Sequence, residues 1–128
     1  MAKIYFDTNV LIDFVGERKY GFEKMAKGSE VFVSTLSMHI IAYVLKAKIP
    51  DNRLRILAEA MEMVDFSGVI MDKSLEGPTD DFEDNIQLHS AVSGDCDYFL
   101  TLDKKLLKMK YFGKIKISDK IQTNVANK

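Results

Sequence analysis

The chain has 128 residues, of which 47% are apolar and 29% are charged, and its formal net charge is −1. This balance predicts a single globular domain over residues 1–128 and argues against a protein that coats nucleic acid through bulk positive charge. The one cysteine, Cys96, excludes an internal disulfide and a cysteine metal cluster, and it suits a reducing compartment. No apolar run approaches the roughly 18 residues that span a membrane, and no signal-peptide pattern is present, so we expect a cytoplasmic protein with no membrane partner.

Charge is distributed unevenly along the chain. Residues 1–94 carry 10 Lys and Arg against 15 Asp and Glu, whereas residues 95–128 carry 8 against 4. The acidic part could hold a metal ion and the basic part could hold phosphate, although ordinary solvated lysines explain the basic part equally well.

The first informative stretch, residues 4–13, is an apolar run that ends in an acid and passes directly into a helix pattern. Residues 4–6 are β-branched and aromatic types typical of a buried strand, which places Asp7 at the carboxyl end of that strand. Thr8 or Asn9 can cap the helix that follows. Because open α/β sheets bind ligands at this edge, Asp7 is a candidate cation ligand, and a simple capping role is an equally good interpretation.

The rest of the chain alternates between strand and helix patterns. Further strands are predicted over residues 30–34, 63–66, 98–101 and, as a peripheral strand, 114–117. Helices are predicted over residues 10–15, 20–26, 37–49, 53–62 and 81–93, around 106–107, and after a cap at Ser118 or Asp119; residues 69–75 fit either type. This order predicts an α/β fold of three layers, α/β/α, with helices on both faces of a mostly parallel central sheet.

Three acids can meet at one edge of such a sheet. Asp81 and Asp84 form a helix-start signal in which Asp81 is the better cap, so Asp84 lies on the first turn, where the helix dipole favours a carboxylate. Asp103 follows the buried run 98–101 and repeats the arrangement around Asp7. Three converging acids repel one another unless cations neutralise them. Mg²⁺ and Mn²⁺ take such oxygen ligands, and paired ions about 3.5–4 Å apart activate water and stabilise a phosphoryl transition state.

Four short motifs occur in order along the chain. They are Asp7-Thr8-Asn9 after a strand, Ser34-Thr35-Leu36 before a helix, Asp81-Phe82-Glu83-Asp84, and Asp97-Tyr98-Phe99-Leu100-Thr101-Leu102-Asp103. The ordered set, from near residue 3 to about residue 117, resembles the PIN domain, and in particular the VapC-type toxins of bacterial toxin–antitoxin pairs. The resemblance implies a PIN-like fold and a metal-dependent endoribonuclease.

The resemblance also implies roles for individual residues. Asp7, Asp84 and Asp103 would be the acidic ligands of Mg²⁺ or Mn²⁺. Thr101 would orient Asp103 or a bound water, and Asn9 would steady Asp7. Two more acids that fit the pattern are interpreted as structural, Asp13 on the first helix and Asp97 at a cap or turn. Such toxins commonly dimerise and are inhibited by a cognate antitoxin, so the expected partners are an RNA substrate, an antitoxin and a second copy of the chain.

One residue departs from the family pattern. The helix after residues 34–37 usually carries a glutamate of the acidic quartet where this chain has His39. A neutral imidazole binds Mn²⁺ but is a poor ligand for Mg²⁺, so His39 is a further candidate ligand, and the lost negative charge should weaken metal binding. Three alternatives remain open: an active site with altered metal preference, an active site with one ion, and a degenerate PIN-like module that only binds RNA or protein. Asp80 or Glu83 could compensate.

The leading hypothesis is therefore hydrolysis of RNA phosphodiester bonds by metal-activated water. Lys104, Lys105 and Lys108, which follow the last acid, could guide the RNA backbone. A phosphoacceptor signalling domain is a further alternative, with Asp65 as its acceptor. It fits poorly, because the first strand ends in one acid instead of an adjacent pair and Thr101 stands where such a domain has a lysine.

Overall fold

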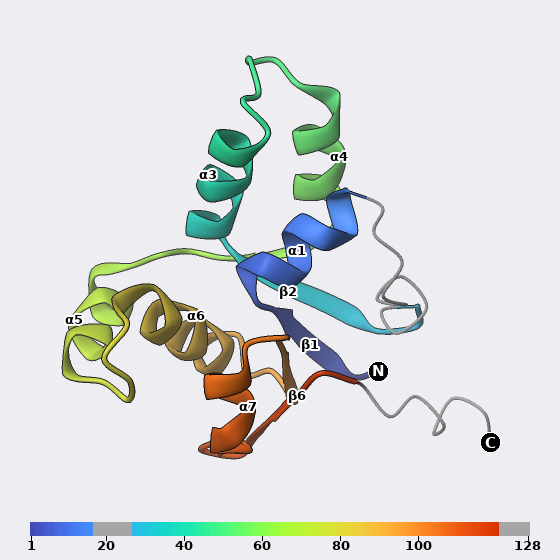
Figure 1. The fold of residues 1–128 in the computed structure, drawn as a ribbon. Coiled ribbons are helices and arrows are strands. Elements are labelled where there is room, and N and C mark those ends of the chain that lie inside the picture. Colours follow the sequence, from blue (N-terminus) through green and yellow to red (C-terminus); the bar gives the residue numbers. More distant parts are fainter. Residues whose placement is uncertain (17–26, 121–128) are drawn as a thin grey trace.

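The computed structural model describes residues 1–16 and 27–120, which form one six-stranded sheet with helices on both faces (Figure 1). The strands are β1 (Lys3–Phe6), β2 (Glu30–Ser34), β3 (Glu62–Val64), β4 (Tyr98–Leu100), β5 (Tyr111–Phe112) and β6 (Ile115–Ser118). Their order in the sheet is β3-β2-β1-β4-β6-β5, and every pairing is parallel except that of β5 with β6. The predicted three-layer α/β fold is confirmed.

The strand β1 explains why both faces of the sheet are covered. Its side chains alternate between the two faces, as in any strand, and Ile4, Tyr5 and Phe6 are all fully buried. Ile4 and Phe6 belong to one apolar cluster and Tyr5 belongs to the other. The sheet is therefore apolar on both sides, as parallel sheets between helices are.

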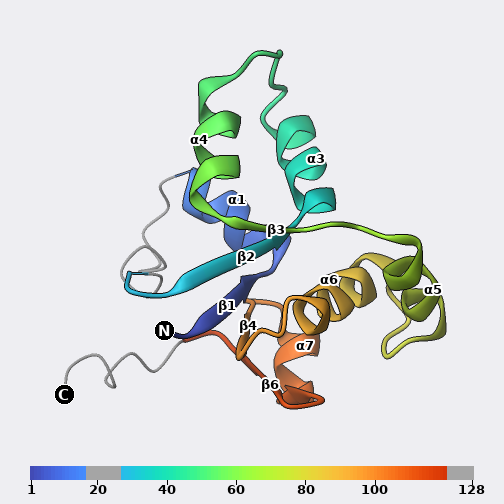
Figure 2. The same ribbon diagram turned by 180° about the vertical axis from the view of Figure 1, so that it is seen from behind.

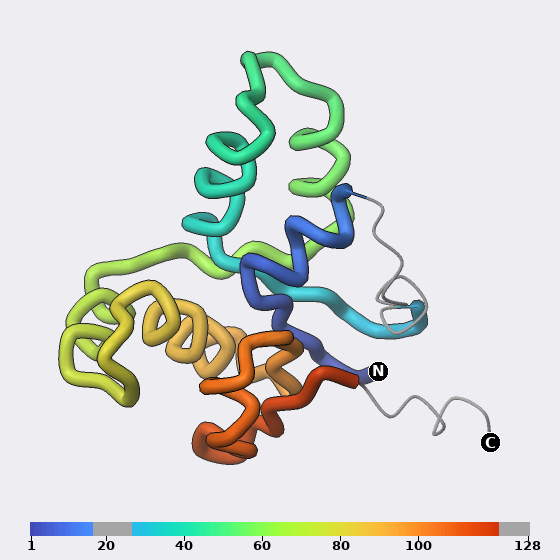
Figure 3. Tube along the Cα trace, viewed as in Figure 1, coloured from blue at the N-terminus to red at the C-terminus, as the bar shows by residue number. Residues whose placement is uncertain are grey.

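Among the residues that the structure describes, helices α1 (Thr8–Val15), α3 (Thr35–Val44) and α4 (Asn52–Ala60) cover one face and α5 (Gly68–Glu76), α6 (Phe82–Ser93) and α7 (Lys104–Met109) cover the other (Figures 1 and 2). The first group covers the face of Ile4 and Phe6, and the second group covers the face of Tyr5. Figure 3 shows the chain leaving the sheet along α3 and returning along α4, with their connection at the distant end of the pair. Within the two described ranges, no helix has the length and apolarity that crossing a membrane requires.

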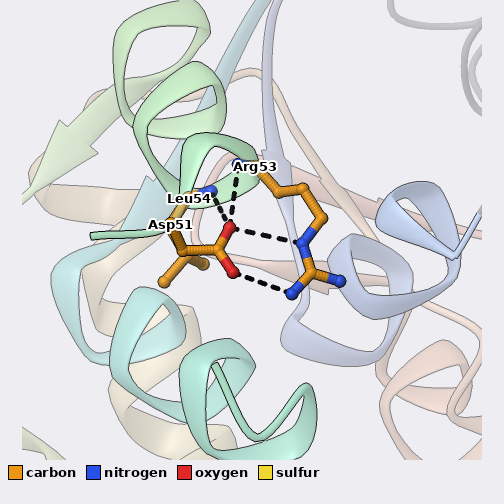
Figure 4. A network of polar contacts seen from close by, with 3 residues as sticks. All are labelled: Asp51, Arg53 and Leu54. Carbon is orange, nitrogen blue, oxygen red and sulfur yellow. Dashed lines mark hydrogen bonds and ion pairs between the residues drawn. The ribbon is translucent and has the colours of Figure 1, made fainter. Parts of the chain in front are cut away.

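Polar side chains cap the described helices, although α1 is capped by Asp7 and α3 by Ser34 where the prediction gave Thr8 or Asn9 and Ser37. Asp51 is an example: its Oδ1 accepts hydrogen bonds from the N–H groups of Arg53 and Leu54, at 2.8 and 3.3 Å (Figure 4). The guanidinium of Arg53 also donates to both carboxylate oxygens of Asp51 and lowers the pKa of that carboxyl. Asp51 therefore starts α4, which corresponds to the helix predicted over residues 53–62.

The predicted bounds of the third helix are wrong at both ends. The helix α3 starts at Thr35 because the hydroxyl of Ser34 accepts from the N–H of Leu36 and caps it there, two residues before the predicted start at Ser37. It ends at Val44, well before Ile49, because Lys46 adopts a φ of 51° that an α-helix cannot continue through.

The remaining secondary-structure predictions concern residues 69–75, the peripheral strand and two short helices. Residues 69–75, which fitted either type, are helical and lie in α5. The predicted peripheral strand is β6, and it lies inside the sheet because β5 pairs along its outer edge. The helix predicted over residues 20–26 and the one predicted after Ser118 or Asp119 lie outside the described residues.

Gly94 at the end of α6 should not tolerate a side chain. A Cβ there would lie 3.1 Å from a ring carbon of Phe32 and 3.3 Å from a methyl of Val64, both in the core. We expect Gly94→Ala to lower the free energy of unfolding by about 1 kcal/mol through overpacking, measured by urea denaturation. Gly68→Ala is the matched control, because a Cβ at that helical position meets nothing within 4 Å and alanine should be neutral or stabilising. Equal losses in the two variants would contradict this account.

Candidate active site at the carboxyl edge of the sheet

The ends of three neighbouring strands meet at the carboxyl edge of the sheet. The N–H of Asp7, directly after β1, donates to the carbonyl of Leu100 at 3.0 Å. The N–H of Thr101, directly after β4, donates to the carbonyl of Ser118 at 3.0 Å. Asp7 and Thr101 therefore lie side by side where the sequence predicts a ligand site.

Asp7 is held rigidly and is only 5% exposed. Its Oδ1 accepts from the N–H of Thr8 at 2.8 Å, and its Oδ2 accepts from the hydroxyl of Thr101 at 2.7 Å. Burial raises the pKa of Asp7 to about 6, against the lowering effect of these two hydrogen bonds, and the nearby Glu83 and Asp103 carboxylates raise it further. Asp7 is thus the N-cap of α1 and also part of an acidic cluster, so the two interpretations of this residue are compatible.

Thr101 links two of the acids. It is fully buried, and its hydroxyl oxygen accepts from the N–H of Asp103 at 3.0 Å while its hydroxyl proton is donated to Asp7. Asp103 is the N-cap of α7, since its Oδ1 accepts from the N–H of Lys105 at 2.8 Å. The side chain of Thr101 therefore orients the carboxylate of Asp7 and contacts only the backbone of Asp103.

The first turn of α6 brings more acids to the same edge. Asp81 is the N-cap, as predicted, and its Oδ1 accepts from the N–H of Asp84 at 2.9 Å. The pKa of Asp84 is raised to about 7, first by burial and then by the charges of Asp81, Asp7, Asp103 and Glu83. Burial and Asp81 also raise the pKa of Glu83. The predicted ligands Asp7, Asp84 and Asp103 are therefore close enough to interact electrostatically.

The donor atoms of this cluster are suited to a hard divalent cation. They are carboxylate oxygens, and each oxygen can accept two hydrogen bonds or ligate a metal through a free lone pair. Across residues 1–16 and 27–120, no three His, Cys, Asp or Glu side chains lie close enough together to enclose an ion as they stand. Asp84 and Asp103 are only partly buried, so solvent reaches their side chains, whereas Asp7 is almost fully enclosed.

Two residues expected at the site share no hydrogen bond or ion pair with the acids within residues 1–16 and 27–120. His39 is exposed in the second turn of α3, where the prediction placed it in the first turn, and no hydrogen bond or ion pair between described residues joins it to an acid. Asn9 is exposed on α1, and the described hydrogen bonds of Asp7 come from Thr8 and Thr101 instead.

The remaining sequence predictions for this region concern lysines and a structural acid. Lys104, Lys105 and Lys108 are exposed on α7, which begins immediately after Asp103. Asp97 lies before β4, and its Oδ2 accepts from the N–H of Lys3 at 2.9 Å, which agrees with a structural role.

A buried polar cluster beneath the acids was missed at the sequence level. The hydroxyl of Tyr5 donates to Oε1 of Gln87, and the hydroxyl of Ser37 donates to the same oxygen at 3.2 Å. The hydroxyls of Ser37 and Thr8 lie 2.9 Å apart, and the oxygen of Tyr5 accepts from the N–H of Ser34 at 3.1 Å.

Two spacings in the sequence could have revealed this cluster. Tyr5 stands two positions before Asp7 on a strand, and Gln87 stands three positions after Asp84 on a helix. Each pair shares one face of its strand or helix. A polar residue on the same face as each acid therefore indicates a polar contact next to the acids.

The raised pKa values predict how stability depends on pH without divalent ions. The folded-state pKa values, about 6 for Asp7 and about 7 for Asp84, exceed the usual value of 3.8, so the folded chain keeps protons that the unfolded chain has lost. The stability associated with these protons is complete below about pH 4 and is lost as the pH rises through 6 and 7. We expect Asp84→Asn to match the parent at pH 4 and to be more stable by about 1 kcal/mol at pH 8, after allowance for solvent screening of a partly exposed group.

Denaturant unfolding in chelator at each pH measures this difference. Asp72→Asn, which changes an exposed acid on α5, is the control and should show no such gain. A difference between Asp84→Asn and the parent that does not grow with pH would contradict the electrostatic account.

Comparison with known proteins places this geometry in a family. The fold resembles VapBC2 from Rickettsia felis, solved bound to a DNA fragment from the promoter, with a TM-score of 0.64, 17% sequence identity and coverage of 91% of this chain and 97% of that chain. It also resembles Mycobacterium tuberculosis VapC20, a Sarcin-Ricin loop cleaving toxin, with a TM-score of 0.63, 8% identity and coverage of 88% and 98%. A search of curated protein sequences gave no significant match. The family model of the PIN domain matches residues 3–105, so the chain belongs to the PIN domain family.

Proposed function

We propose that the protein is a divalent-metal-dependent endoribonuclease and the VapC-type toxin of a toxin–antitoxin pair. The observation that carries the proposal is the acidic cluster at the carboxyl edge of a PIN domain. Two of its members, Asp7 and Asp84, have pKa values raised to about 6 and 7 by burial and by the other acids. A cluster of acids that disfavour one another's charge is stabilised by a bound cation.

Asp7, Asp84 and Asp103 are the residues that would hold Mg²⁺ or Mn²⁺. When bound, such an ion supplies an activated water and stabilises the charge that develops on the phosphate. Asp7 contributes a fixed carboxylate, because Thr101 and the N–H of Thr8 hold its two oxygens. Asn9, on the first turn of α1, is proposed to steady Asp7 when the ion is bound.

The lysines of α7 are proposed to bind the RNA backbone. Lys104, Lys105 and Lys108 are exposed, and their helix is capped by Asp103, so cationic side chains stand beside the acidic cluster. Contacts of this kind position phosphates without reading the base sequence.

The proposed partners and location follow from the family resemblance. VapBC2 from Rickettsia felis was solved as an assembly on promoter DNA, and we propose by analogy a cognate antitoxin and a homodimer for this chain. The exposed apolar residues Tyr43, Ile49 and Ile56 on and between α3 and α4 offer contact area for a partner protein. A cytoplasmic location is proposed because the one cysteine, Cys96, is free and buried.

A PIN-like module that binds RNA or protein without cleavage is the alternative. The observation that favours it is His39, an exposed imidazole that replaces the glutamate typical of the family. A site short of one acid binds divalent ions less tightly and could have lost its activity.

Cleavage of a mixed RNA pool by the purified chain tests the proposal. We expect cleavage with Mg²⁺ or Mn²⁺, none with chelator, and a loss of at least about 1,000-fold in folded Asp7→Asn or Asp84→Asn, because each loses a ligand charge. Asp97→Asn is the matched control and should retain activity, since the side-chain hydrogen bond of this acid in the described part of the chain comes from the backbone N–H of Lys3.

Two results would contradict the nuclease proposal. Full activity in either folded variant would exclude the acidic cluster as the active site. RNA binding without cleavage under any divalent ion would select the binding module, and a gain of activity in His39→Glu would then attribute the loss to that position.

The basic helix gives a separate prediction. Lys104→Ala with Lys108→Ala should raise KM for RNA several-fold with little change in kcat, and should reduce the salt dependence of binding, because two phosphate contacts are lost. The control is the double change to alanine of Lys48, in the loop between α3 and α4, and of Lys73, on α5, since both are exposed and lie outside α7. Kinetics at two ionic strengths measure both effects, and equal results for the two double variants would exclude a specific role for α7.

A further inference from the structure

Two pairs of residues lie between β1 and α6: Asp7 and Asp84, which interact through their charges, and Tyr5 and Gln87, which share a hydrogen bond. Asp7 and Tyr5 are two positions apart in extended backbone, which continues through Asp7 (φ −57°, ψ 150°), so both point to the same face of the sheet. Asp84 and Gln87 are three positions apart on α6 and lie on the same face of that helix. The hydroxyl of Tyr5 donates to Oε1 of Gln87, and we call these two residues the neutral pair. The neutral pair therefore lies next to Asp7 and Asp84, further into the core.

The neutral pair is also connected to Asp7 by a second route. The hydroxyl of Ser37 on α3 donates to Oε1 of Gln87 at 3.2 Å and lies 2.9 Å from the hydroxyl of Thr8. The N–H of Thr8 donates in turn to Oδ1 of Asp7. Tyr5, Gln87 and Ser37 are fully buried, so water does not compete for these hydrogen bonds.

This polar cluster is not the most stable way to fill the core. Among the described residues, Nε2 of Gln87 and Oγ of Ser90 are buried without a hydrogen-bond partner. Such atoms destabilise the folded state, and an apolar helix face would avoid them. Departures of this kind from good packing are expected beside functional sites.

The repulsion between Asp7 and Asp84 explains why a directional hydrogen bond is needed between β1 and α6. Asp7 and Asp84 raise one another's energy when both are charged, so the end of β1 and the first turn of α6 carry groups that repel. Apolar packing resists separation but does not fix how the helix is rotated or how far it slides along the strand. A hydrogen bond between Tyr5 and Gln87 fixes both, because it requires one distance and one direction.

We infer that Tyr5 and Gln87 are positioning residues that set the separation of Asp7 and Asp84, and thereby the affinity of the site for a divalent cation. The inference rests on the proposed function, since it assigns a role towards the metal that these two acids would bind. Groups that orient metal ligands typically change metal affinity 10- to 100-fold when they are removed.

Mn²⁺ binding to the full chain, measured by calorimetry, tests the inference. Tyr5→Phe and Gln87→Met remove the polar atoms at nearly constant volume. Each should weaken Mn²⁺ binding about 10-fold, and the double variant should be no weaker than the worse single variant, because either change alone already breaks the hydrogen bond. Thermal unfolding in chelator confirms that each variant is folded.

A matched pair of serines separates positioning from general loosening of the core. Ser37 and Ser74 are both buried and each donates one hydroxyl hydrogen bond, Ser37 to Gln87 and Ser74 to the carbonyl of Ile70 within α5. We expect Ser37→Ala to weaken Mn²⁺ binding several-fold and Ser74→Ala to leave it unchanged. If Tyr5→Phe fails to fold, this pair carries the test.

Three outcomes would overturn the inference, and they differ in whether they also contradict the proposed function. Folded Tyr5→Phe and Gln87→Met with parental Mn²⁺ affinity would exclude the positioning role and leave the proposed function intact. Equal weakening in Ser37→Ala and Ser74→Ala would do the same. A parent chain that binds no Mn²⁺ would overturn the inference together with the metal-dependent function.

Discussion

The site depends on the burial of one carboxylate at the end of the central strand. The strand β1 lies between β2 and β4 and is covered on both faces, so the residue after it enters the interior whatever its chemistry. Burial is the largest influence on Asp7 and opposes its charge, while the N–H of Thr8 and the hydroxyl of Thr101 favour it. The end of β4 and the start of α1 are thereby fixed around Asp7, because each supplies one of these two donors.

Much of this arrangement could be predicted because strand ends and helix caps are local in sequence. An apolar run followed by an acid located Asp7 and Asp103, and the spacing of Asp81 and Asp84 located the start of α6. The predicted start of α3 was wrong because Ser34 and Ser37 are both acceptable caps. Its predicted end was wrong because a lysine gives no indication that Lys46 adopts a positive φ. Local chemistry predicts whether a cap exists better than it selects between neighbouring caps.

The contact between α6 and β1 is indicated less directly, by the spacings of Tyr5 from Asp7 and of Gln87 from Asp84. It depends on which helix face meets the sheet, and the sequence offers several apolar residues on α6 without stating which of them face Tyr5. Which charges act on the site also depends on how the helices pack on the sheet. The family resemblance drew attention to His39, which is exposed on α3, whereas the acids that interact electrostatically with Asp7 are Glu83, Asp84 and Asp103. Carboxylates on α6 thus act on Asp7, and the position on α3 that the resemblance singled out carries an exposed imidazole.

The acids differ in how firmly they are held, and this difference has a consequence for metal binding. Asp7 is fixed by two hydrogen bonds in the interior, whereas Asp84 and Asp103 are partly exposed and belong to the first turn of α6 and the cap of α7. A cation bound to all three would connect β1 to both helices and would remove the repulsion that separates them. Metal affinity and the stability of this edge therefore both depend on the repulsion among the acids, because a bound cation removes that repulsion. The Tyr5–Gln87 hydrogen bond holds β1 and α6 together without adding a charge.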